Sequence, residues 1–245
     1  MAGKEQSKAP SKEEQKAIIK NQMYQYLVER EQEWASKPEN QADYALLKQM
    51  LNEINAFGFD FKYFYDIKRL LITNEEVVQI ILKYLGKFEN PSRTASLVNS
   101  ISHKNNKFVT DKIIEMFNKY SSDMRKGQAV SYDNALNRLK DKRYIDQYLE
   151  WLADPDMAAH LPLTMVLLAR WKHPKARELF FQYASPEIEK PLAFTVINAM
   201  AVYRDDEAKD KLLVMQKSTD ENVSGYAKKT YNKLIAKEKP SSIKE

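Results

Sequence analysis

The chain has 245 residues, of which 43% are hydrophobic, with only five glycines and no cysteine. This length and composition are typical of a soluble globular protein with a large core. The missing cysteines exclude disulfides and thiolate metal sites, and the scarcity of glycine argues against hairpin turns. The 39 basic and 34 acidic residues give a net charge of +5 and are interspersed, which is only a mild hint of a polyanionic partner.

The start of the chain is polar. Residues 1–10 are expected to be disordered, and the first sixteen residues lack the apolar core of a secretory signal. No apolar run approaches the roughly 18 residues that a membrane helix requires. We therefore expect a cytoplasmic protein with no membrane partner.

Apolar residues at spacings of three and four predict helices throughout residues 11–236, which we expect to form one all-α domain. A helix over about 11–35 lies in an N-terminal capping segment, residues 11–39. Helix-pair repeats follow over residues 40–236. The tail, residues 237–245, is basic and expected to be flexible, because Pro240 ends the last helix.

The first pair of the repeat region is weak. One helix is predicted around Ala42 to Met50, and a second over about Lys62 to Ile72. The stretch 121–131, "SSDMRKGQAVS", is predicted to be a longer surface loop, since it supplies the extra residues of the one 35-residue repeat.

The later repeats align in columns. Adjacent apolar pairs recur at spacings of 32, 35, 32 and 32 residues, with the first member of each pair at Ile81, Ile113, Tyr148, Phe180 and Leu212. Further apolar residues stand four residues before and three residues after each of these. Every repeat is thus predicted to carry a first helix with one apolar stripe.

The second helix of each repeat agrees with the first. One column holds Leu97, Tyr132, Thr164 and Val196, and another holds Ile101, Leu136, Leu168 and Met200. A third column between them is mostly small. The predicted starts of the second helices are marked by cap residues and prolines, at Asn90-Pro91-Ser92, Asp154-Pro155-Asp156, Ser185-Pro186-Glu187 and Thr219-Asp220-Glu221.

This period and these columns resemble the HEAT and armadillo-like superhelical family over about residues 40–236. The resemblance implies a right-handed α-α superhelix, a solenoid, of about five or six helix pairs with a period of 31–35 residues. The chain departs from the usual pattern because its second helices lack a regular arginine and its units are short. Tetratricopeptide repeats come near in length, but their Trp, Gly and Tyr signature is missing.

Signals for an enzyme are poor, and we predict no catalytic residue, metal site or cofactor. The three histidines lack metal-ligand spacing, and the carboxylate pairs Glu75-Glu76 and Asp205-Asp206 fall at predicted helix starts, where acidic side chains suit the helix dipole. A remote alternative is a helical-repeat DNA glycosylase for alkylated bases, with Trp151 and Asp154 as its candidates. Trp151 falls in an apolar column, so we expect it in the core.

A binding surface is the stronger prospect, because in the resembling family the second helices line a concave face. Opposite the apolar columns, pairs of polar residues at i, i+4 point the same way. We call these candidates the ridge: Asn99, His103, Asn134, Arg138, Arg170, Asn198, Lys229 and Lys233. A solvated helix face is the plain alternative, and Val166 and Val202 interrupt the pattern.

The sequence leads to two candidate functions. The first is a non-enzymatic scaffold that binds a partner protein or peptide, possibly an acidic one, on the second-helix face. The second is a nucleic-acid-binding protein that uses the ridge and the lysines near the C-terminus. The sequence leaves the partner and the oligomeric state open.

The stretch "WKHPKARELFF", residues 171–181, has the composition of a small active site or an anion-binding cluster. Its place in the repeat register instead predicts the joint between two repeats. His173 aligns with the predicted cap residues Asn74, Asn106, Asp141 and Asp205. Trp171 aligns with apolar residues at the other joints, with Lys104 as the one outlier. We therefore predict that His173 begins a helix and that Trp171 packs.

Overall fold

A computed structural model of the protein describes residues 11–68, 70–121 and 126–236. The predicted disordered start, residues 1–10, and the predicted basic tail, residues 237–245, lie outside these residues. The described residues form fourteen α-helices with short 3₁₀ turns and contain no strand, which confirms the all-α prediction. None of the described helices is long and apolar enough to cross a membrane.

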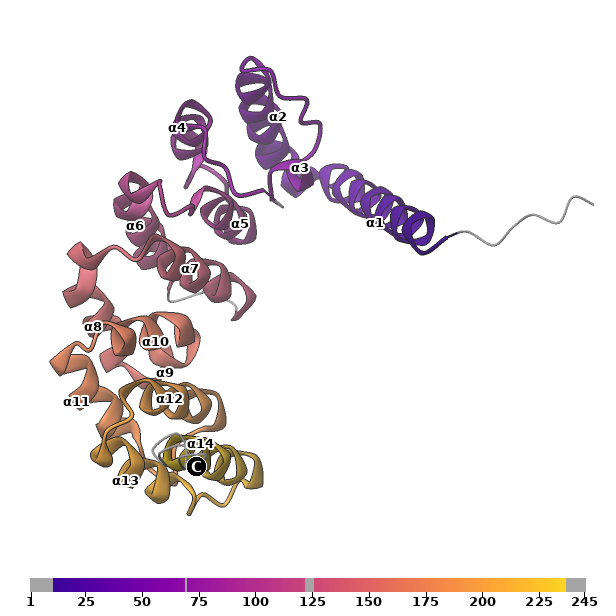
Figure 1. Cartoon of the computed structure of the whole chain (residues 1–245). Helices are drawn as coiled ribbons and strands as arrows, with labels where there is room; N and C mark the ends of the chain where they lie inside the picture. Colours follow the sequence, from indigo (N-terminus) through magenta and orange to yellow (C-terminus); the bar gives the residue numbers. More distant parts are fainter. Residues whose placement is uncertain (1–10, 69, 122–125, 237–245) are drawn as a thin grey trace, which may run out of the picture.

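The helices follow one another through short connections (Figure 1). Their bounds are α1 Lys12–Ala35, α2 Gln41–Asn55, α3 Phe64–Lys68, α4 Glu75–Tyr84, α5 Pro91–Ile101, α6 Thr110–Tyr120, α7 Lys126–Leu139, α8 Ile145–Ala153, α9 Pro155–His160, α10 Pro162–Arg170, α11 Pro174–Tyr183, α12 Lys190–Tyr203, α13 Asp206–Met215 and α14 Glu221–Ala236.

From α2 onward the helices form two layers along an arc (Figure 1). Helices α2, α4, α6, α8, α11 and α13 lie on the outer side, and α5, α7, α10, α12 and α14 lie on the inner side. Each inner helix packs against the next, α5 on α7, α7 on α10, α10 on α12 and α12 on α14. Helix α1 leaves this arc beside α3.

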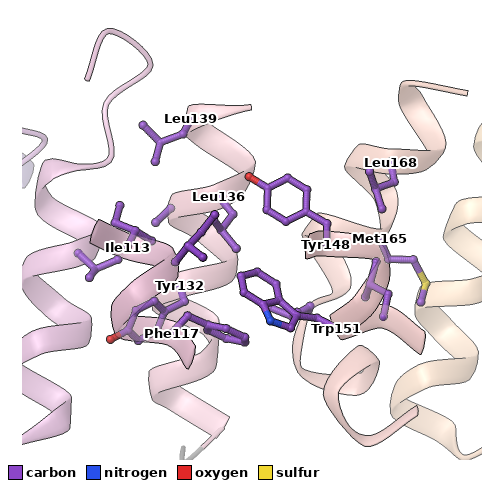
Figure 2. Packing of buried hydrophobic residues seen from close by; sticks show 14 of the residues in the cluster. Ile113, Phe117, Tyr132, Leu136, Leu139, Tyr148, Trp151, Met165 and Leu168 are labelled. Carbon is purple, nitrogen blue, oxygen red and sulfur yellow. The ribbon is translucent and has the colours of Figure 1, made fainter. Parts of the chain in front are cut away.

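The predicted columns form the core. Ile81, Ile113, Tyr148, Phe180 and Leu212 are all fully buried, as are Ile101, Leu136, Leu168 and Met200 on the inner helices. Figure 2 shows the core where the side chains of α6, α7, α8 and α10 meet. Burying one such side chain contributes about 1.5 to 3 kcal/mol, so stacking of the helix pairs stabilises the arc.

The second half of α1 is held by polar contacts as well as by packing. The backbone N–H of Phe64 donates to Glu31 Oε1 at 2.9 Å. Farther up the helix, the Tyr24 hydroxyl donates to Asp66 Oδ1 at 3.2 Å. Val28 is buried on the same side. In the described part of the chain, these contacts hold α1 to the rest of the protein through its last three turns.

Helix α3 is shorter than the predicted helix over Lys62 to Ile72. Asp66 accepts the backbone N–H groups of Lys62 and Tyr63, which fixes a turn there, so the helix begins only at Phe64. Beyond the helix, the N–H of Ile72 donates to the carbonyl of Ser100 in α5 at 2.8 Å. This stretch is thus bonded to the next helix pair instead of continuing its own helix.

The predicted surface loop over residues 121–131 is wrong in its second part. Helix α7 begins at Lys126, so residues 126–131 are helical, while residues 122–125 lie outside the described residues. Gln128 and Ala129 are buried, which shows that packing recruits the first turn of α7 into the arc.

The second helix of the fourth repeat is broken in two. Helix α9 ends at His160 and α10 begins at Pro162, because proline has no N–H to donate and its ring clashes with the preceding turn. The start of α10 is capped from another helix: Asp133 in α7 accepts from the N–H groups of Leu163 and Thr164 at 2.7 and 2.8 Å.

The predicted cap residues are mostly confirmed. Asn90, Asp154 and Asp220 each accept a backbone N–H at the start of a helix. The prediction at Ser185-Pro186-Glu187 is wrong, since those residues form a turn and α12 begins at Lys190.

Candidate functional site

The residues of the ridge lie on the inner helices at different depths, with one exception. The sequence predicts His103 on a second helix, but α5 ends at Ile101 and His103 lies in the segment that follows it. Asn99, His103, Asn134 and Arg138 are half-buried, whereas Arg170, Asn198, Lys229 and Lys233 are exposed. They follow α5, α7, α10, α12 and α14 in turn along the arc (Figure 1). The structure brings together some of these residues and separates others.

Asn99 and Arg138 are joined between α5 and α7. Arg138 Nη1 donates to Asn99 Oδ1 at 2.8 Å and to the Asn99 carbonyl at 3.2 Å. It also lies 3.3 Å from the Ser102 hydroxyl. A cation placed on the last carbonyls of a helix is favourable because the helix dipole is negative there. Asn99 thus positions the guanidinium of Arg138.

Asn198 makes a second link between neighbouring inner helices. Its Oδ1 accepts from the Tyr226 hydroxyl of α14 at 2.7 Å. The Tyr226 ring meets Phe194 edge to face, with the ring centroids 5.3 Å apart. This amide therefore serves the packing of α12 on α14.

A basic hollow lies where α5 and α7 end. Its volume is about 750 Å³, and it combines two ridge residues with side chains from the loop after each helix. The lining residues are Leu71, His103, Lys104, Asn105, Lys107, Asn137, Arg138, Leu139 and Lys140. We refer to this site as the basic hollow. Four permanent cations and one histidine line it, without a carboxylate.

The cations of the basic hollow are available to a ligand. Lys104, Lys107 and Lys140 are exposed, and none of the hollow's four cations forms an ion pair within 4 Å among residues 11–68, 70–121 and 126–236. The backbone N–H of Asn105 donates to His103 Nδ1 at 3.3 Å, so Nε2 is the histidine nitrogen that can donate to a ligand.

Backbone geometry places Lys140 at the rim. Its φ is +50°, a left-handed conformation in which glycine is the usual residue after a helix, and its N–H donates to the Leu136 carbonyl. Lys172 and Arg204 take the same conformation after α10 and α12, with φ of +56° and +61°. Three consecutive inner helices thus end in a basic residue where glycine would be less strained.

These three residues use their charges differently. Lys172 Nζ donates to the carbonyls of Val202 and Tyr203 at 2.7 and 3.2 Å, and Arg204 Nε donates to Ala201 at 3.2 Å. Both therefore cap the end of α12. The Lys140 ammonium makes no hydrogen bond or ion pair in the described part of the chain, and it faces the basic hollow.

A separate, smaller hollow of about 490 Å³ lies on α14, at the far end of the arc. It contains Lys229 and Lys233, together with Gly225, Lys228, Asn232 and Ala236. Asn134, Arg170 and Asn198 line neither hollow. The ridge is therefore divided into two hollows, and of the three residues between them Asn198 has a packing role.

Sequence reasoning missed Lys104, Lys107, Lys140, Asn105 and Asn137 as site residues. One signal was present: Lys104 stands alone in an otherwise apolar column at the joints between repeats. The helical period does not determine the positions of Asn105, Lys107 and Lys140, which lie outside the α-helices. Asn137 lies in α7, where the helical pattern applies.

The residues considered for an enzyme have structural contacts. Trp151 is buried, its Nε1 donates to Asn118 Oδ1 at 3.0 Å, and its ring lies 4.4 Å from that of Phe117 (Figure 2). Asp154 accepts from the N–H of Asp156 at the start of α9. The predicted core position of Trp151 and the helix-start position of Asp154 are confirmed.

The remaining acidic candidates and His173 also lie at helix starts, whereas His160 ends α9. Glu75 and Glu76 open α4, and Asp205 caps α13 by accepting from Ala208 N at 2.9 Å, as predicted. His173 precedes α11 but makes no side-chain cap bond, although the aligned Asn74 does. In the described residues, no three His, Asp or Glu side chains gather where they could hold a metal ion.

The chain matches no known protein-family model. Neither curated proteins nor solved structures show significant similarity to it.

Proposed function

We propose that the protein is a helical-repeat binding module that holds an acidic segment of a partner protein in the basic hollow. In this proposal the two layers of helices form a right-handed, HEAT-like solenoid of about five or six pairs, whose inner helices carry the site. The observation that best supports this proposal is the lining of the basic hollow. Four cations and a histidine line it, and the lining contains no carboxylate and no internal ion pair.

The chemistry of the basic hollow suits carboxylates on a peptide. The lysines and Arg138 supply charge-assisted hydrogen bonds, which are shorter and stronger than neutral ones. The amides of Asn105 and Asn137 offer both donors and acceptors for a peptide backbone. Because Arg138 is already held by Asn99, part of the site is preorganised and loses little entropy on binding.

The charges elsewhere on the arc favour a short acidic segment over a long nucleic acid. A hollow of about 420 Å³ contains Glu39, Asp43 and Glu89, and another of about 380 Å³ contains Asp156, Glu187 and Glu189. Negative charge at these places would repel a polyanion that followed the arc. Positive charge is local, which supports a protein partner and leaves nucleic acid as the second candidate.

The proposal predicts binding of a fluorescent, glutamate-rich peptide, measured by anisotropy on the full chain. The double variant Lys104→Glu/Lys107→Glu should weaken binding at least about tenfold, since two attractive charges become repulsive. The matched control Lys228→Glu/Lys229→Glu makes the same charge change on α14 and should alter the affinity less than about twofold.

The competing outcomes are distinct. Equal loss in both double variants would mean that net charge and not the basic hollow governs binding. If single-stranded or duplex oligonucleotides bind at about 50 mM salt while the acidic peptide does not, the nucleic-acid function replaces the proposal.

A further inference from the structure

The first half of α1 stands clear of the other described helices. Residues 11–23 are all exposed, and Figure 1 shows these turns beyond the reach of the other labelled helices. Isolated helices of this length are marginal in water, because most helical stability in proteins comes from packing an apolar face. The Ser11 and Glu14 capping box stabilises the start of α1 but covers no apolar surface.

This exposed helix carries an apolar stripe. Ile19, Met23 and Tyr26 are spaced i, i+4 and i+7, which places them on one face. Their exposed fractions are 62%, 53% and 55%. The face that binds the body is a different one and holds Val28 and Glu31. We call Ile19, Met23 and Tyr26 the α1 stripe.

We propose that the α1 stripe pairs with the α1 stripe of a second copy of this chain, in antiparallel orientation. Met23 lies at the midpoint of a helix that runs from Lys12 to Ala35. A two-fold axis near Met23 would bring Ile19 of each copy against Tyr26 of the other. Both stripes would then be covered at once, as an isologous interface requires.

The charges along α1 favour the antiparallel orientation. Among the exposed residues of the first half, three lysines (Lys12, Lys16 and Lys20) outnumber Glu13 and Glu14. In the second half, Glu29 and Glu33 outnumber Arg30. Antiparallel pairing places the net positive half over the net negative half and also opposes the helix dipoles, whereas parallel pairing places like charge on like.

The same charges weigh against an anionic membrane surface, because four exposed glutamates lie on the 24 residues of α1. A helix of this length spans about 36 Å, so a two-fold axis near Met23 lays the free first half of each α1 along the second half of the other. The pairing does not involve the basic hollow, and the two proposals stand or fall separately.

Light scattering after size-exclusion chromatography tests the pairing on the full chain. The expected result is a shift from 28.6 kDa toward twice that mass as the concentration rises from about 1 to 100 µM, the range expected for a small interface. Ile19→Lys should raise the dimer Kd at least about tenfold. The neighbouring Ile18→Lys is the control: Ile18 is also exposed but points about 100° away, and it should change the Kd less than about twofold.

Cross-linking tests the orientation, since the chain has no cysteine of its own. In an antiparallel pair, a mixture of Ile19→Cys and Tyr26→Cys chains should form an oxidised heterodimer, while either variant alone should not. Helical circular dichroism of each variant should match that of the unmodified chain, because all three positions are exposed.

Several outcomes overturn the proposal. A chain that stays monomeric to about 100 µM leaves the stripe to a different partner protein. A dimer that Ile18→Lys weakens as much as Ile19→Lys excludes the α1 stripe, and cross-linking of Ile19→Cys chains with one another indicates parallel helices. The Lys104→Glu/Lys107→Glu variant should remain dimeric, which separates failure of this pairing from failure of the peptide site.

Discussion

At the scale of single residues, Asp133 is a buried carboxylate whose pKa the fold raises. It is 1% exposed and accepts three hydrogen bonds at the start of α10, two from the backbone and one from the Thr164 hydroxyl. Burial raises its pKa to about 6, and the hydrogen bonds from Leu163 and Thr164 only partly oppose that shift. The residue therefore links the stability of the arc to pH.

The sign of this link follows from proton binding. With its pKa raised above the ordinary value of 3.8, folded Asp133 holds its proton more tightly than the unfolded chain does between about pH 4 and 6. Its contribution to the free energy of unfolding is fully present below pH 4 and is lost as the pH rises through 6. The loss is of the order of 2 to 3 kcal/mol.

Urea unfolding at several pH values checks this prediction. Asp133→Asn cannot titrate, so the difference in unfolding free energy between the variant and the unmodified chain should change by about that amount between pH 4 and 7. Thr164→Val removes a hydrogen bond that lowers the pKa of Asp133, and should extend the decline to higher pH. Parallel pH profiles for all three proteins would contradict the assignment.

At the scale of helices, the left-handed residues separate stability from binding. Lys140→Gly relieves the strain of a side chain at positive φ and breaks no hydrogen bond in the described residues, so the variant should be more stable by about 0.5 to 1 kcal/mol. Lys172→Gly relieves the same strain but loses two hydrogen bonds to the end of α12, so it should be near neutral.

Thermal unfolding and peptide anisotropy, measured on the same samples, give the two readouts. Lys140→Gly should raise the midpoint of unfolding while it weakens binding of the glutamate-rich peptide, because the basic hollow loses a cation. Lys172→Gly should leave peptide binding unchanged. A Lys140→Gly protein that is more stable and binds the peptide as before would remove Lys140 from the site.

The helices themselves could be predicted because the information is local. Ile81, Ile113 and Leu212 recur at a nearly fixed period, and their burial follows from apolar spacing within one helix. The contacts between repeats could not be predicted in this way. Asp133 caps a helix that begins 29 residues later in the chain, and Arg138 is bonded to Asn99 in the preceding helix pair, so both depend on how the pairs stack.

The same reason limits what the sequence says about the candidate site. Arg138 could be placed on the ridge because it lies in α7, where helical spacing fixes its direction. His103 lies beyond the end of α5, so the predicted i, i+4 spacing from Asn99 does not determine its position. Lys104 and Lys107 lie between the end of α5 and the start of α6. Their positions in the basic hollow therefore depend on the path of that connection. The helical pattern also does not predict that half of α1 is exposed, because apolar spacing within one helix does not specify which other helix packs against it.

At the scale of the whole molecule, Arg93 connects α1 to the arc. It is 8% exposed, and its guanidinium lies 3.6 Å from the centroid of the Trp34 ring and 4.6 Å from that of Phe64. Burial lowers its pKa, while the charges of Glu31 and Asp43 act in the opposite direction. Side chains of α1, α2, α3 and α5 thus meet around one buried cation.

Replacing Arg93 by Ala should release α1 from the arc, because the substitution opens a cavity beside Trp34 and leaves Glu31 without its nearby cation. In an array where each repeat contacts only its neighbours, the loss stays local. Amide exchange rates should rise at least about tenfold in the second half of α1 and in α3, and should remain unchanged in α10 to α14. A tenfold rise corresponds to a decrease of about 1.4 kcal/mol in the free energy of local opening. Arg93→Lys should not restore protection, since an ammonium lacks the planar face that stacks on Trp34. Faster exchange along the whole arc would instead mean that the chain unfolds as a single cooperative unit, which contradicts the solenoid proposal at its physical basis.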